Sequence, residues 1–149
     1  MLSVKTLEKL ISDKKYGIAE INPGIVFVIG AKDCRKDILA SFIRDMASFD
    51  FFAGEIRSTM DIERLVCEIS DKKIIATLQA KDISRALERI KTLSEDDSIF
   101  ENFPIVFERN SMADRYKTIK RNTKAIISIS ARYYIPGVSF QVLPNPFFS

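Results

Sequence analysis

The residues best suited to bind an anion lie between Gly30 and Asp37, in the segment Gly-Ala-Lys-Asp-Cys-Arg-Lys-Asp. A phosphate-binding loop has Gly, four residues, Gly, Lys and then Ser or Thr, and it lies between a strand and a helix. Gly30 and Lys36 occupy the first glycine and the lysine of that pattern. The segment therefore keeps the frame of a phosphate-binding loop.

Two other positions in this loop depart from the pattern. Arg35 stands where the second glycine belongs, and we expect its β-carbon to obstruct a backbone that must curl its amides toward phosphate. Asp37 replaces the hydroxyl that would ligate magnesium, so a carboxylate would lie beside the phosphates. At about 4 Å and an effective dielectric of about 20, each like-charge pair costs roughly 4 kcal/mol. Taken alone, the segment is more simply interpreted as a solvated turn between a strand and a helix.

The composition excludes several kinds of catalysis. The chain has 149 residues and no histidine, which excludes a Ser-His-Asp triad, a Cys-His dyad and His-ligated zinc. A net charge of +3 does not by itself indicate a nucleic-acid or membrane partner. The two cysteines fit a reducing compartment, and we expect Cys34 to be an inert thiol and Cys67 to lie in the core. We expect neither a metal nor a cofactor.

The strands and helices that must position the loop are predicted by hydrophobic periodicity. Apolar residues run without interruption from Ile25 to Ile29, which is typical of a strand buried on both faces of a parallel sheet. From Lys36 to Ala47 they recur at helical spacing. The apolar side of this helix consists of Ile38, Leu39, Phe42, Ile43 and Met46. We expect further strands at 49–53, 74–78 and 138–143, helices at 3–15, 59–70, 82–93 and 112–124, and a strand or buried helix end at 125–130.

Strands that alternate with helices predict an α/β domain with three layers and a mainly parallel sheet. We expect an N-terminal helix within residues 1–20 and the α/β domain over residues 21–149. The longest apolar run, Gly24 to Ala31, is far shorter than the roughly 20 residues of a membrane-spanning helix. The N-terminus also lacks the apolar stretch of a signal peptide, so we expect a cytoplasmic protein.

In this order, the segments resemble the secretion ATPases of type II and type IV systems, and most closely the retraction motors of type IV pili. Residues 23–30 resemble the family's strand into the Walker A loop, and Phe52 to Arg57 resembles its Walker B strand, which ends in Gly-Glu-Met/Ile-Arg. Residues 74–80 are similar to the strand that ends in its Leu-His-Thr box, and 125–143 to its closing region. The resemblance covers residues 21–143 and implies a RecA-like P-loop core.

Departures from the family pattern determine the function that we expect. Gln79 replaces the histidine of the His box. Only a few residues around Ser48 connect the Walker A helix to the Walker B strand, where the family has an Asp-box strand and arginines that serve neighbouring nucleotides. We therefore expect a core that is truncated as well as degenerate, and we expect no counterpart of the family's N-terminal PAS-like domain.

The acid and the lysine of the ATPase pattern have alternative roles. Glu55 matches the Walker B glutamate, which in the family would polarise the attacking water. Without the Asp box and the Ser or Thr ligand, we expect Glu55 to have a structural role, paired with Arg57. Lys36 either attracts an anion at the N-terminus of its helix or forms a salt bridge.

Because several catalytic elements are altered together, the sequence predicts a protein without catalytic activity. We expect a structural or adaptor component of a type IV secretion or type IV pilus machine, cytoplasmic or peripheral to an inner-membrane secretion complex. Its expected partners are components of that apparatus or an active ATPase relative. A hexameric ring is not expected, because the family forms its rings with the elements that are missing here.

Two other functions remain open. One is a weak or partner-activated NTPase with residual nucleotide binding. The other is a nucleic-acid-binding module, although we expect its basic residues to form a solvated or partner-facing helix instead. These residues are Arg109, Arg115, Lys117, Lys120, Arg121 and Lys124. The terminal pair Phe147 and Phe148 belongs either to the core or to a docking element.

Overall fold

Five strands form one sheet in the computed structural model, which describes residues 23–32, 34–69, 71–96, 112–129 and 140–145. The order of the strands is β2-β3-β1-β4-β5. The first four are parallel, and β5 runs antiparallel to β4. Their bounds are β1 Gly24–Gly30, β2 Phe51–Glu55, β3 Lys73–Gln79, β4 Thr123–Ile129 and β5 Phe140–Pro144.

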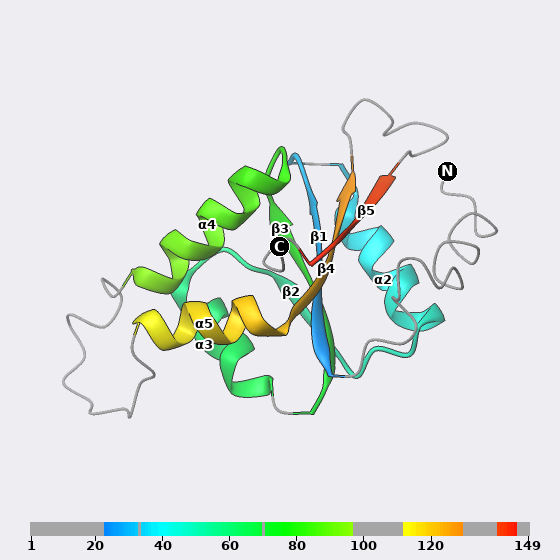
Figure 1. Cartoon of the computed structure of the whole chain (residues 1–149). Helices are drawn as coiled ribbons and strands as arrows, with labels where there is room; N and C mark the ends of the chain where they lie inside the picture. The colour runs from blue at the N-terminus through cyan, green and yellow to red at the C-terminus, as the bar shows by residue number, and fades with distance from the viewer. Residues whose placement is uncertain (1–22, 33, 70, 97–111, 130–139, 146–149) are drawn as a thin grey trace.

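Helices cover both faces of this sheet (Figure 1). One face is covered by α2, and the opposite face by α3, α4 and α5. These helices are α2 Lys36–Met46, α3 Thr59–Glu68, α4 Ile83–Glu95 and α5 Met112–Asn122. The expected three-layer α/β fold is confirmed.

Most expected elements are present with small shifts at their ends. Of the ambiguous segment at 125–130, residues 125–129 belong to strand β4, and residue 130 lies outside the described residues. Strand β4 begins at Thr123, so α5 ends two residues earlier than expected. Strand β2 begins at Phe51 rather than at Phe49. The expected helix at 3–15 and the pair Phe147 and Phe148 lie outside the described residues.

Strand β1 is central, and this explains its uninterrupted apolar run. All seven residues from Gly24 to Gly30 are buried. Val26 and Val28 pack in the cluster beneath α2, whereas Ile25, Phe27 and Ile29 pack in the cluster beneath the other three helices. Successive side chains point to opposite faces of a strand, so both layers require apolar residues here.

Local hydrogen bonds fix where the helices after β2 and β3 begin. Ser58 and Asp61 form a capping box at α3, with Asp61 N donating to Ser58 Oγ over 3.4 Å and Ser58 N donating to Asp61 Oδ2 over 3.0 Å. At α4 the Asp82 carboxylate accepts a hydrogen bond of 2.9 Å from Arg85 N. Such caps contribute about 1 kcal/mol each. They place the start of each helix beside the end of its strand.

The buried faces of α2 and α3 are narrower than expected. On α2, Ile38 and Phe42 are 43% and 39% exposed, because Leu39, Ala40 and Ile43 form the face that meets the sheet. The prediction that Cys67 lies in the core is wrong, since this thiol is exposed. It follows the buried Val66 by one residue, and one residue turns a helix by about 100°.

Arg115 of α5 is buried and contacts both α3 and α4. It is 1% exposed, its Nε donates to the Ser94 carbonyl over 2.8 Å, and its Nη1 contacts the Glu63 carboxylate. Thr59 Oγ1 donates over 2.9 Å to the neighbouring Leu93 carbonyl. The last carbonyls of α4 thereby gain partners that the helix itself does not supply.

The expectation that Arg115 belongs to an exposed basic face is therefore wrong. Helix α5 packs against α3 and α4, and this turns Arg115 inward. Lys117, Lys120 and Arg121 are exposed, Lys124 is half-buried, and Arg109 lies outside the described residues. No helix within the described ranges is long and apolar enough to cross a membrane.

Candidate functional site

Most of the predicted site residues meet at the carboxyl ends of β1, β2 and β3. Parallel sheets bind ligands at this edge, because the loops that leave the strands lie side by side there. A cavity of about 840 Å³ opens at the edge. Its lining includes every predicted site residue except Gly30. The lining residues are Lys32, Arg35, Lys36, Asp37, Phe52, Gly54, Glu55, Arg57, Thr77, Gln79 and Arg89.

Gly30 does not line the cavity, and its lack of a β-carbon leaves room for the Cys34 side chain. A β-carbon at Gly30 would lie well inside the contact distance of Cys34 Sγ and 3.2 Å from the Ile129 carbonyl oxygen. Cys34 is buried, and this burial raises the pKa of its thiol, although the charge of Lys36 acts in the opposite direction. A buried thiol with a raised pKa is a poor nucleophile. Gly30 and Cys34 are thus a packed pair.

Arg35 begins helix α2 in a conformation that glycine adopts more easily. Its φ of 60° and ψ of 34° are left-handed, and its side chain makes no capping hydrogen bond. The left-handed conformation costs a residue with a β-carbon about 1–2 kcal/mol. Arg35 adopts this conformation despite its β-carbon, and the expected obstruction of amides that curl toward phosphate stays a prediction. The Arg35 side chain is exposed and lines the cavity.

Lys36 is buried and folds back across the loop that precedes it. Its Nζ donates to the Ala31 carbonyl over 3.4 Å and lies 3.8 Å from Glu55 Oε1. The alternative in which Lys36 forms a salt bridge therefore has a definite partner. The ammonium group faces the cavity with a carboxylate already beside it.

Glu55 reaches this position because strand β2 bulges just before it. Gly54 has a φ of 73°, and the register between β2 and β3 shifts between Phe52 and Glu55. A glycine takes this conformation without strain, and a bulge re-aims the side chain that follows it. Glu55 also accepts a hydrogen bond from Arg57 Nε. Two cations therefore neutralise the carboxylate that matches the Walker B acid.

Gln79 ends strand β3 beside Gly30 of β1. The Ala80 amide donates to the Gly30 carbonyl over 3.0 Å, which ties the two strand ends together. Gln79 is exposed and lines the cavity, but its neutral amide has no proton to transfer near neutral pH. No group of three or more Cys, Asp or Glu side chains that could hold a metal ion occurs within the described ranges.

A second cavity of about 570 Å³ adjoins the first, since Lys32, Gln79 and Arg89 line both. Sequence reasoning missed the residues that α4 contributes to these cavities. Arg85 and Arg89 are four residues apart on α4, a spacing that puts both cations on one face of the helix, and Lys81 lies just before the helix begins. This spacing is the feature of the sequence that could have indicated a basic site.

Comparisons with known proteins define the fold. No protein-family model matches the chain, and no curated protein matches it in sequence. Among solved structures, the chain is similar to the VirB11 ATPase from the Brucella suis type IV secretion system, which was crystallised in complex with sulphate. The TM-score is 0.63 at 8% sequence identity. The match covers 98% of this chain and 57% of that chain.

The chain thus has the α/β fold of part of a secretion ATPase and spans somewhat more than half the length of the structure that it matches. This agrees with the expected resemblance at the level of the fold. At this identity the likeness concerns the fold alone. The finer resemblance to pilus retraction motors stays a prediction.

Proposed function

We propose that the chain is a non-hydrolysing protein on a secretion-ATPase fold. It acts as a structural or adaptor component of a type IV secretion or type IV pilus machine, through contacts with other proteins. The observation that carries this proposal is the network of Lys36, Glu55 and Arg57 at the carboxyl edge of the sheet. In this network the residues that would contact a nucleotide contact one another instead.

This network opposes both the binding of nucleotide phosphates by Lys36 and the polarisation of water by Glu55. A P-loop lysine must reach the β- and γ-phosphates, whereas Lys36 lies beside Glu55 and the Ala31 carbonyl. An acid that polarises water is weakened when two cations neutralise it, as they do Glu55. Asp37 lines the same cavity and would repel a phosphate by roughly 4 kcal/mol at about 4 Å and an effective dielectric near 20.

Thermal melting with millimolar Mg-ATP tests this proposal. A ligand that binds only the folded state raises the melting temperature once its concentration exceeds its dissociation constant. We expect no rise for the wild-type chain and no release of phosphate. A clear rise that Lys36→Ala abolishes and Lys91→Ala retains would contradict the proposal, because Lys91 is exposed on α4 and lines neither cavity.

A weak or partner-activated NTPase is the second candidate, and two observations favour it. Arg35 keeps a left-handed turn despite its side chain, and the cavity of about 840 Å³ is within the usual size of a small-molecule site. The double variant Arg35→Gly/Asp37→Thr completes the loop pattern. If Asp37 and the side chain of Arg35 are the obstacles, this variant gains a melting shift with Mg-ATP that the wild-type chain lacks.

A further inference from the structure

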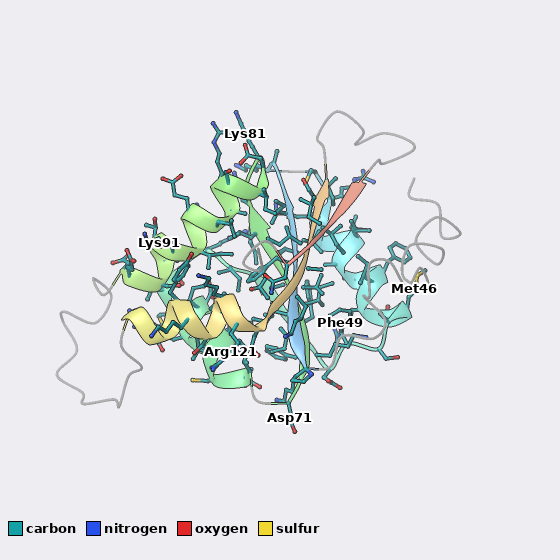
Figure 2. The ribbon with its side chains drawn as sticks, viewed as in Figure 1. Met46, Phe49, Asp71, Lys81, Lys91 and Arg121 are labelled. Carbon is teal, nitrogen blue, oxygen red and sulfur yellow. The ribbon has the colours of Figure 1, made fainter. Side chains whose placement is uncertain are left out.

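The second cavity is a basic site beside the degenerate loop. Four cationic side chains line it, together with one acid, Glu88. The cations are Lys32, Lys81, Arg85 and Arg89. They come from two stretches that are far apart in the sequence, the loop after β1 and the region from the end of β3 into α4. Figure 2 shows Lys81 at the edge of the sheet where the parallel strands end, whereas Asp71 lies at the other edge, where they begin.

Three of these cations have no partner within the part of the chain that the structure describes. The side chains of Lys32, Lys81 and Arg89 make no ion pair or hydrogen bond with other described residues. Arg85 pairs with Asp82 over 3.1 Å, outside the lining of the cavity. Like charges that converge on one hollow repel one another, and an anionic ligand relieves that repulsion.

The surroundings favour carboxylates of a protein over a nucleic acid. No aromatic residue lines the second cavity, whereas single-stranded nucleic acids bind where bases stack on rings. Acidic side chains also interrupt the positive surface, with Glu88 in this cavity and Asp37 and Glu55 in the adjoining one. Four cations with an acid among them suit a few carboxylates better than a long phosphate backbone.

We propose that the cavity formed by Lys32, Lys81, Arg85 and Arg89 binds an acidic segment of a partner protein. The inference rests on the proposed function, in which the chain acts through contacts with other proteins. Arginine receives a carboxylate through two parallel hydrogen bonds, and lysine adds a point charge. Arg89 is central to this site because it faces both cavities.

Charge reversal on α4 tests the site. The probe is a short fluorescein-labelled peptide rich in glutamate, and its binding to the full chain is followed by fluorescence anisotropy at low and at physiological salt. We expect the wild-type chain to bind the peptide and Arg89→Glu to weaken binding by about tenfold or more. The matched control is Lys91→Glu, which makes the same change of charge on the same helix outside both cavities (Figure 2). We expect it to change binding by less than about twofold.

Three results would overturn the inference. The first is an absence of peptide binding at low salt. The second is equal weakening by Arg89→Glu and Lys91→Glu, which would mean that net charge alone attracts the peptide. The third is tighter binding of a labelled oligothymidylate than of the peptide at equal salt, with sensitivity to Arg89→Glu, because the site would then bind nucleic acid. Melting curves of both variants establish that each is folded.

Phosphate release from Mg-ATP, measured on the same wild-type sample, separates this inference from the proposed function. If neither peptide binding nor phosphate release is detected, the acidic-segment site is rejected and the non-hydrolysing role stands. If peptide binding and phosphate release occur together, the non-hydrolysing role is rejected and the site stands.

Discussion

Cys34, Arg35 and Lys36 alternate between buried and exposed positions in the loop after β1. Cys34 packs against Gly30, Arg35 is exposed in a left-handed conformation, and Lys36 turns back toward Ala31 and Glu55. The buried side chains of Cys34 and Lys36 therefore both contact other parts of the fold. This arrangement makes its chemistry that of a packed turn, and it can be tested one residue at a time.

The two cysteines are expected to differ in reactivity. In the native protein, Cys67 is exposed and should react with a thiol reagent at the rate of an open thiol. Cys34 is buried with a raised pKa, so its alkylation should be at least about a hundredfold slower, because the loop must open first. Mass spectrometry of Cys34→Ala and Cys67→Ala after timed labelling assigns the rates. Similar rates for the two thiols would mean that Cys34 is not packed against Gly30.

A side chain at position 30 is expected to destabilise the fold. Gly30→Ala should lower the free energy of unfolding by about 1–3 kcal/mol, because the new methyl group overlaps Cys34 Sγ. Cys34→Ala removes that sulfur, so the double variant should lose less stability than the sum of the two single variants. Denaturant unfolding of the four proteins measures this coupling. Strict additivity would show that the two residues do not interact.

At the scale of elements, the buried ion pair between α5 and α3 is expected to matter more than any exposed charge on α5. Arg115→Met leaves the Glu63 carboxylate and the Ser94 carbonyl without their partner and should lower the free energy of unfolding by about 2–4 kcal/mol. Arg121→Met on the same helix should change it by less than about 0.5 kcal/mol, since Arg121 is exposed. Equal losses in chemical denaturation would contradict the buried position of Arg115.

The start of β3 is expected to make stability depend on pH. Burial lowers the pKa of Lys73, whose Nζ donates to the Ala47 carbonyl over 2.6 Å and lies over the Phe49 ring. Because the unfolded chain then binds more protons, stability rises with pH in the range below the ordinary lysine pKa of about 10.5. The free energy of unfolding of the wild-type chain should therefore rise with pH relative to that of Lys73→Met.

Lys72 provides the opposite control for this measurement. A hydrogen bond to Glu68 raises the pKa of Lys72, so its contribution is fully present below the ordinary lysine pKa and is lost as pH rises through the folded value. The difference between the wild-type chain and Lys72→Met should therefore stay flat between about pH 7 and about pH 10. The assignment of the two lysines would be wrong if the difference in unfolding free energy from the wild-type chain changed with pH for Lys72→Met and stayed constant for Lys73→Met.

Elements with a strong pattern could be predicted from the sequence, and features that depend on packing could not. The apolar run in β1 and the helical period of α4 each follow from a single segment. The left-handed conformation of Arg35, by contrast, lies between two buried residues, Cys34 and Lys36, whose burial depends on the rest of the fold. The burial of Arg115 depends on three helices meeting, and a basic residue in a polar helix carries no local sign of that.

The candidate site could be predicted in part for the same reason. The loop after β1 and the end of β2 were found because each follows a strand in a known pattern. The cations of α4 were missed, because they join Lys32 only once β1 and β3 are paired in register. The bulge at Gly54 that brings Glu55 to Lys36 likewise depends on the pairing of β2 with β3.

At the scale of the whole molecule, the carboxyl edge of the sheet combines an internally paired loop with a neighbouring basic hollow. The fold is that of part of a secretion ATPase, and the match spans 57% of the VirB11 structure. The boundary between residues 1–20 and 21–149, the lack of a hexameric ring and the absence of catalysis stay predictions. The unpaired cations of the basic hollow are the basis of the proposed site for an acidic partner.

A crystal structure grown with Mg²⁺ and a non-hydrolysable ATP analogue tests most directly whether the loop after β1 is closed to a triphosphate. We predict that Lys36 Nζ stays beside Glu55 and the Ala31 carbonyl and that no triphosphate lies against the loop. A triphosphate seated against Gly30 and Lys36, with metal in place and Glu55 displaced from the lysine, would contradict the non-hydrolysing role.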